Sequence, residues 1–247
     1  MELDLSIVLI GSTAVLVAGF LRGLTGFGFA LIAVPVLSVL VSPKLVVPLI
    51  VIHALAASAP LIFGARHHAQ PRRIWPLMVT GSAGVPFGSY LLLVLDADAL
   101  RLMIGGVAIV SAGLLMTGFK YQVKRELLAY IPVGLASGVL QGSSGLAGPP
   151  VILFFTNQGV PPLVFRANIL AFFFVQGIAT VAAFTVAGLF SRDAFVLSAI
   201  FAPALLVGTY SGARFASKAT AGLFKAIAIT VVLLGGASAI ASGLGIL

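Results

Sequence analysis

Arg22 is the residue best suited to bind a ligand, because it is a cation inside a long apolar stretch. None of the acidic residues lies in an apolar stretch where it could pair with Arg22; they are Glu2, Asp4, Asp96, Asp98, Glu126 and Asp193. A charge without a partner in apolar surroundings is costly and points to function. A guanidinium can form bidentate hydrogen bonds to a carboxylate, sulfonate or sulfite. We therefore expect Arg22 to contact an anion; the alternative is a structural cation that reaches an interface or caps helix carbonyls.

Two glycine-rich segments, 22–29 and 141–150, combine glycines with polar side chains. If the chain leaves the helical conformation there inside a membrane, its backbone groups must face protein or a watery cavity. Helix N-termini in these segments would offer N–H donors to an anion. The candidate substrate-binding residues are Arg22, Gly23, Thr25 and Gly26 in the first segment and Gln141, Ser143, Ser144 and Gly145 in the second. The alternative reading is close helix packing, for which small residues at a spacing of about four are typical.

Three further polar residues lie within predicted spans. His53 is the one histidine inside such a span, whereas His67 and His68 lie in a basic loop. Its imidazole could relay protons, or it could be a hydrogen-bonded helix contact. Asn168 is a further substrate-binding candidate and, with Gln176, lies on the span after the second glycine-rich segment.

Groups that carry most enzyme chemistry are missing from the sequence. There is no Cys, no HExxH, no phosphate-binding GxxxxGK[ST] and no pair of carboxylates within a span. We therefore expect no metal, no cofactor and no enzymatic activity.

Composition places the chain in a membrane. Hydrophobic residues make up 60% of the 247 residues and charged residues 8%, and the mean hydropathy is +1.20, unlike a soluble domain. The start lacks the basic region of a cleaved signal peptide, so we expect the first apolar run to remain in the mature protein. The net charge of +8 comes from cations that lie almost entirely in short loops, which indicates membrane topology rather than nucleic-acid binding.

Apolar stretches predict an all-α polytopic membrane protein. Six are long enough to cross a bilayer: 45–65, 76–95, 102–119, 167–190, 194–213 and 226–246. Two longer regions, 5–41 and 128–155, are interrupted by glycines and polar residues. We predict that each forms two short half-helices joined by a broken turn.

Basic residues predict which loops face the cytoplasm. They cluster at Arg66, Arg72 and Arg73, at Lys120, Lys124 and Arg125, and at Arg214, Lys218 and Lys225. The positive-inside rule places all three clusters in the cytoplasm. The N-terminus, the loop at Asp96 and Asp98, and the C-terminus are then predicted to be periplasmic.

An internal repeat divides the chain. Segments 18–26 and 137–145 are identical at four of nine positions, and Phe87-Gly88-Ser89-Tyr90 matches Val207-Gly208-Thr209-Tyr210 at nearly the same offset. This pattern indicates duplication, with one repeat over 1–119 and the other over 120–247. Each half contains one broken hairpin and three spans, an odd number of crossings, so we predict two inverted repeats. Paired broken helices in inverted repeats are typical of secondary transporters with a site near the midplane.

The motifs Gly-Leu-Thr-Gly-Phe-Gly at 23–28 and Gly-Ser-Ser-Gly-Leu-Ala-Gly-Pro-Pro at 142–150, in a chain of this length and hydropathy, resemble the TauE/SafE family of sulfite and organosulfonate exporters. The resemblance covers essentially the whole chain. It implies transport of small sulfur-containing anions across the bacterial cytoplasmic membrane, coupled to protons. Arg22 and Gln141 occupy equivalent repeat positions but differ chemically, so either one or both tips could bind the anion.

The leading hypothesis is therefore a secondary transporter that binds a small anion between the two glycine-rich tips and works by alternating access. A passive anion channel is the main alternative. A membrane-embedded enzyme or assembly factor is disfavoured by the missing catalytic groups. The expected partners are the lipid bilayer and a small anion, with no nucleic acid; the sequence leaves homo-oligomerisation open.

Overall fold

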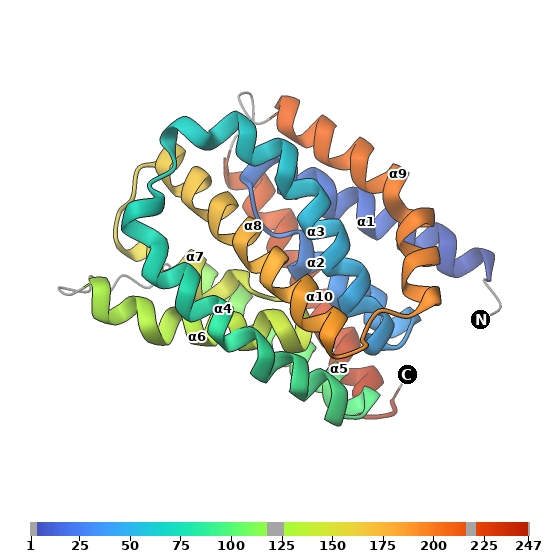
Figure 1. The fold of residues 1–247 in the computed structure, drawn as a ribbon. Helices are drawn as coiled ribbons and strands as arrows, with labels where there is room; N and C mark the ends of the chain where they lie inside the picture. Colours follow the sequence, from blue (N-terminus) through green and yellow to red (C-terminus); the bar gives the residue numbers. More distant parts are fainter. Residues whose placement is uncertain (1–3, 118–125, 216–220, 247) are drawn as a thin grey trace.

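The computed structural model describes residues 4–117, 126–215 and 221–246, and over these ranges every regular element is a helix. The helices are α1 (Leu5–Thr25), α2 (Phe29–Leu40), α3 (Pro43–Ala65), the short η1 (Arg66–His68), α4 (Pro71–Val94), α5 (Ala97–Thr117), α6 (Glu126–Ser144), α7 (Gly148–Asn157), α8 (Pro162–Val186), α9 (Arg192–Phe215) and α10 (Ala221–Gly243) (Figure 1). The predicted all-α fold and the six full spans, which correspond to α3, α4, α5, α8, α9 and α10, are confirmed as helices. Lys120, Lys124, Arg125, Lys218 and the boundary between 119 and 120 lie outside the described residues.

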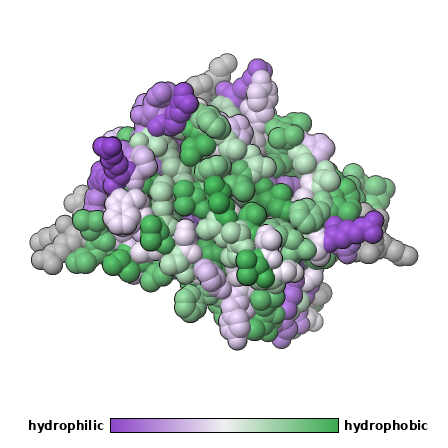
Figure 2. Space-filling view, in the orientation of Figure 1, coloured by the Kyte–Doolittle hydropathy of each residue, from purple (hydrophilic) through white to green (hydrophobic). Residues whose placement is uncertain are grey.

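Seven helices in the described part of the chain are long and apolar enough to cross a membrane. Large apolar side chains cover the outside of the bundle, among them Phe63 (67% exposed), Phe87 (70%) and Val186 (91%). Figure 2 shows one face covered by hydrophobic residues, with hydrophilic residues toward its rim. Soluble monomers rarely expose so large an apolar surface, so this surface faces lipid.

The two broken hairpins differ from the predicted pairs of short half-helices. The first helix of each hairpin is long: α1 has 21 residues and α6 has 19, which corresponds to about 30 Å, and both are among the candidate spans. Only the second helices are short, with 12 residues in α2 and 10 in α7. The half-helix prediction was wrong for α1 and α6 because most of their glycines lie within continuous helix.

Those helical glycines allow two pairs of helices to touch along their backbones. Gly19 and Gly23 of α1 lie against α9, and Gly138 and Gly142 of α6 lie against α4. A Cβ on Gly142 would lie 2.6 Å from the backbone nitrogen of Ser89, which is closer than atoms can pack. Small residues that let membrane helices approach closely are the driving feature of such interfaces. Close helix packing, the alternative reading of the two glycine-rich segments, is therefore observed at Gly23 and Gly142.

The two glycine-lined pairs run in opposite directions through the bundle. Arg166 donates from near the start of α8 to the Gly23 carbonyl at the end of α1, at 2.8 Å. Near the same end, Asn168 accepts from the Gln70 N–H at 2.8 Å, immediately before α4 begins. The α1–α9 pair therefore ends where the α4–α6 pair begins (Figure 1). Two inverted halves would produce this arrangement; the inverted repeat itself stays a prediction.

We predict that Gly138→Ala lowers the thermal unfolding temperature of the detergent-solubilised protein. The new Cβ would meet the Gly81 carbonyl and lie 3.0 Å from the Gly84 Cα, and such overpacking costs about 1–3 kcal/mol. Gly106→Ala on α5 is the matched control, because its Cβ would meet nothing within 4 Å. An equal or higher unfolding temperature for Gly138→Ala would contradict the packing assigned to this glycine.

Candidate functional site

The long helices of the two hairpins end in the same way at equivalent glycines. Gly26 (φ +87°) and Gly145 (φ +72°) adopt the left-handed conformation that ends α1 and α6. The Gly26 N–H donates to the Arg22 carbonyl at 2.7 Å, and the Gly145 N–H donates to the Gln141 carbonyl at 2.9 Å. A side chain would be strained at either φ, which accounts for glycine at both positions. The helix breaks therefore fall within the two glycine-rich segments, as predicted.

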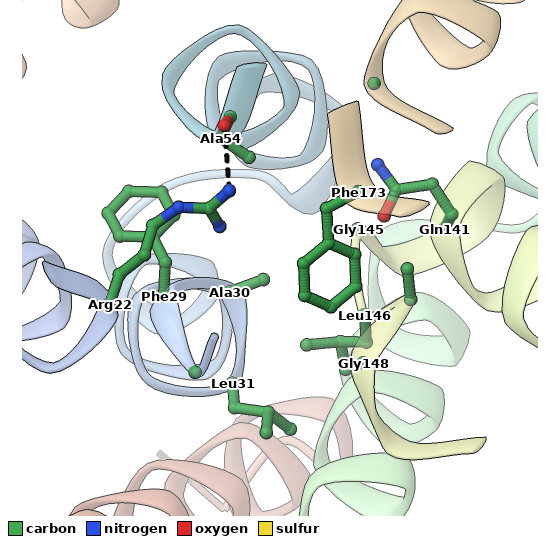
Figure 3. A pocket seen from close by; sticks show the side chains of 13 residues that line it. Arg22, Phe29, Ala30, Leu31, Ala54, Gln141, Gly145, Leu146, Gly148 and Phe173 are labelled. Carbon is green, nitrogen blue, oxygen red and sulfur yellow. Dashed lines mark hydrogen bonds between the residues drawn. The ribbon is translucent and has the colours of Figure 1, made fainter. Parts of the chain in front are cut away.

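A cavity lies between the two turns, with an empty volume of about 450 Å³ that includes a part open to solvent. Its lining residues come from both hairpins and from α3 and α8: Arg22, Gly28, Phe29, Ala30, Leu31, Ala54, Gln141, Gly145, Leu146, Ala147, Gly148, Phe173 and Gly177. Figure 3 shows Arg22 and Gln141 on opposite sides of this cavity, with Phe173 between them. The structure thus brings Arg22, Gln141 and Gly145 of the predicted site together.

Arg22 is buried, with 3% of its surface exposed. Its Nη2 donates to the Ala54 carbonyl of α3 at 3.0 Å and to the Ser58 hydroxyl. Its Nε has no hydrogen-bond partner, and the guanidinium carbon lies 5.8 Å from the centroid of the Phe173 ring. The contacts found around Arg22 are to neutral groups, and the cavity lining holds no carboxylate. In the described structure no carboxylate neutralises the guanidinium, and it has spare donor capacity beside the cavity.

The starts of the two short helices differ in their hydrogen-bond donors. The first residues of α2 are Phe29, Ala30 and Leu31; all three line the cavity, and no side chain caps this end of the helix. In α7 the residues after Gly148 are Pro149 and Pro150, which have no N–H. The expectation that both helix starts offer donors to an anion therefore fits α2 much better than α7.

The other candidate residues of the two turns lie outside the cavity lining. Gly23 packs on α9. The Thr25 hydroxyl donates to the Leu21 carbonyl at 2.8 Å and accepts from the Phe27 N–H at 3.2 Å. Ser143 and Ser144 are fully buried and donate to carbonyls one turn earlier in α6. These groups stabilise the turns and helices that carry Arg22 and Gln141.

The polar residues predicted on the long spans also have local contacts. His53 is buried, and its Nε2 lies 2.9 Å from the Ser198 carbonyl on α9, whereas its Nδ1 has no partner. Asn168 accepts from Gln70 and lies outside the cavity lining. Gln176 is fully buried against Gly81 of α4, and both of its amide atoms lack a partner.

Arg166 is a second cation near the first turn that the sequence reasoning did not select. It is half-buried, its side chain packs over Gly26, and it donates to the Gly23 carbonyl. The repeat offset of 119 pairs Arg166 with Val47, whose side chain packs over Gly145 in the second hairpin. Comparing charges across the repeat would have identified this residue. Arg22 and Arg166 are two cations without a charged counterpart in the other repeat, and both lie at the first hairpin.

Comparisons with known proteins agree with this architecture. The family model for the sulfite exporter TauE/SafE matches residues 12–239. The chain is 28% identical over 251 residues to the "Probable sulfite/organosulfonate exporter TauE" of Cupriavidus necator, with 96% of each chain covered. No solved structure matches the chain. The resemblance seen in the glycine-rich motifs is thus confirmed: the chain belongs to the sulfite exporter TauE/SafE family of membrane transporters.

Proposed function

We propose that this protein is a secondary transporter in the bacterial cytoplasmic membrane that exports a small sulfur oxyanion, either sulfite or an organosulfonate. The family and the function named for the Cupriavidus necator relative support this substrate class. One structural observation carries the site assignment: the buried Arg22 guanidinium has an unpartnered Nε beside a cavity without carboxylates. Membership of an exporter family also favours transport over catalysis.

In this proposal the anion lies between Arg22 and the start of α2. The guanidinium supplies charge-assisted hydrogen bonds, which are stronger than neutral ones. The N–H groups of Phe29, Ala30 and Leu31 are in the first turn of α2, where backbone donors have no partner within the helix. Gln141 lies on the opposite wall of the cavity and supplies a neutral amide.

Alternating access is proposed to arise from two packed units, the α1–α9 pair and the α4–α6 pair, that move against each other. The α1–α9 and α4–α6 pairs each join a hairpin of one repeat to a helix of the other. Each pair is a tightly packed unit, because backbone meets backbone at its glycines. The cavity lies between the hairpins that these pairs carry, so a relative movement of the pairs would open it toward one side and then the other.

We predict that Arg22→Gln lowers anion affinity by at least about thirtyfold, because it removes the charged partner of a buried ion. The measurement is saturable sulfite and methanesulfonate transport in proteoliposomes, together with thermal stabilisation of the purified protein by each anion. Lys44→Gln is the matched control: it also removes one cation, but the Lys44 amine caps the Leu93 carbonyl away from the cavity. Unchanged affinity in Arg22→Gln would place the site elsewhere, and flux that never saturates would favour the channel.

Proton coupling is proposed to involve His53. The His53 ring lies 6.2 Å from the Phe29 ring, which lines the cavity. Its Nε2 is engaged with the Ser198 carbonyl, so the unpartnered Nδ1 is the nitrogen free to accept a proton. Protonation there would place a cation close to the first turn of α2.

We predict that His53→Gln abolishes the ability of a pH gradient to drive uphill transport of methanesulfonate, which carries no proton of its own, while methanesulfonate exchange without a gradient continues. Glutamine keeps a donor for the Ser198 carbonyl, so the contact between α3 and α9 is retained. The two modes are compared in the same proteoliposome preparation. Gradient-driven transport at the wild-type rate would reduce His53 to a structural contact.

The termini are proposed to be periplasmic. Contacts between Arg73 and Glu126, at 2.6 Å, and between Gln70 and Asn168 gather the basic α3–α4 connection and the starts of α6 and α8 at one end of the bundle. That end carries the basic residues that the positive-inside rule assigns to the cytoplasm.

Because the chain has no Cys, sidedness can be read from single cysteines in whole cells. We predict that a membrane-impermeant maleimide labels Arg192→Cys in intact spheroplasts but labels Arg72→Cys only after permeabilisation. Both positions are exposed arginines near helix starts, so the two variants control for each other. The opposite labelling pattern would invert the proposed topology.

A further inference from the structure

The cavity contains one full charge. Arg22 is the only charged residue among the lining residues, and its contacts in the described structure are to neutral groups. The equivalent residue of the second hairpin is Gln141, which is neutral. The acidic residues of the described chain lie near helix ends: Asp4, Asp96, Asp98, Glu126 and Asp193. The cavity therefore has a net charge of about one positive unit before a ligand binds.

Helix dipoles change the net charge of the cavity little. The C-terminal end of α1 and the N-terminal end of α2 meet at the same turn, and their partial charges have opposite signs. The unpartnered N–H groups of α2 can still donate hydrogen bonds to an anion, but the meeting ends do not add a second full charge. Arg166 lies outside the cavity lining, and its half-buried side chain is engaged with the Gly23 carbonyl.

The remaining walls are apolar and would not stabilise excess charge. Phe29, Leu31, Leu146 and Phe173 face the cavity together with small residues. A buried charge that lacks a compensating partner is costly. A singly charged anion would neutralise Arg22, whereas a doubly charged anion would leave one negative charge uncompensated among these side chains.

We propose that the cavity selects oxyanions by their charge and binds monoanions: an organosulfonate with one sulfonate group and a short apolar body, and hydrogensulfite in place of the sulfite dianion. Arg22 binds the oxyanion head, and the apolar walls contact the body of the sulfonate. This inference rests on the proposed function, because it concerns the same site. It adds that export of sulfite follows the fraction of the ligand that carries a proton.

In this inference the pH dependence of sulfite binding comes from the ligand, and methanesulfonate shows separately what titration of a protein group, His53 included, contributes. Two titratable or charged residues lie near Arg22 on the helices around it: His53 on α3, bonded to the Ser198 carbonyl, and Arg166 on α8. Those toward the ends of the helices are Asp4 before α1, Lys44 at the start of α3, Arg66, His67 and His68 directly after α3, and Arg192, Asp193, Tyr210 and Arg214 on α9. Methanesulfonate stays a monoanion across neutral pH, so it reports any titration of these groups.

The test measures binding of methanesulfonate, sulfate and sulfite to the purified wild-type protein by calorimetry, at slightly acidic and slightly alkaline pH. We expect sulfate to bind at least about tenfold more weakly than methanesulfonate, because it leaves a buried charge unpaired. Sulfite affinity should fall as pH rises and hydrogensulfite loses its proton, while methanesulfonate affinity stays constant. Gln141→Arg places a second guanidinium on the opposite wall and should raise sulfate affinity relative to methanesulfonate.

The outcomes separate the proposed anion site at Arg22 from the proposed selection of monoanions. If sulfate binds as tightly as methanesulfonate and both are lost in Arg22→Gln, the site stands and charge selection is refuted. If no anion binds the wild type, both proposals fail. A fall in methanesulfonate affinity with pH that matches the fall for sulfite would assign the pH effect to the protein and overturn the inference. The comparison of the three anions on the wild-type protein tests charge selection even if Gln141→Arg does not fold.

Discussion

The fold depends on one constraint: a chain that leaves the helical conformation inside a membrane must satisfy its backbone polar groups within the protein or at a cavity. Both hairpins meet it in the same way at the ends of their long helices, with a left-handed glycine whose N–H returns to a carbonyl four residues earlier. At the first turn the Thr25 hydroxyl satisfies the Phe27 N–H, and Arg166 satisfies the Gly23 carbonyl. The donors at the start of α2 then remain for the cavity.

The sequence predicted the helical class, a helix at each of the six predicted spans and the places where two helices break, because hydropathy and the repeat are local signals. It did not distinguish glycines that break a helix from glycines that pack one helix on another. Gly23 and Gly26 are three residues apart, yet the first lies against α9 and the second ends α1. The difference is set by a partner helix about 180 residues away along the chain, which no pattern near the motif can show.

The sequence also did not show which polar side chains of the predicted site reach the cavity. Arg22, Gln141 and Gly145 reach the cavity, whereas Thr25, Ser143 and Ser144 hydrogen-bond within their own hairpins. A hydroxyl in a helix can return its proton to a carbonyl one turn back, so composition alone overstates the number of groups free for a ligand. Arg22 was predictable because no residue nearby could neutralise it. Ser58 and Ala54, its actual partners, carry no sequence signal that would pair them with it.

Those neutral partners bear on how a transporter can release what it binds. When the cavity is empty, the Arg22 guanidinium donates to a carbonyl and a hydroxyl of α3, so part of its hydrogen-bonding capacity is satisfied. In the proposed site an arriving anion competes with these neutral acceptors, and a departing anion returns the guanidinium to them. A carboxylate in their place would form a charge-assisted pair that a small anion could displace only at much greater cost. An unpaired guanidinium held by neutral acceptors therefore favours a site that both fills and empties.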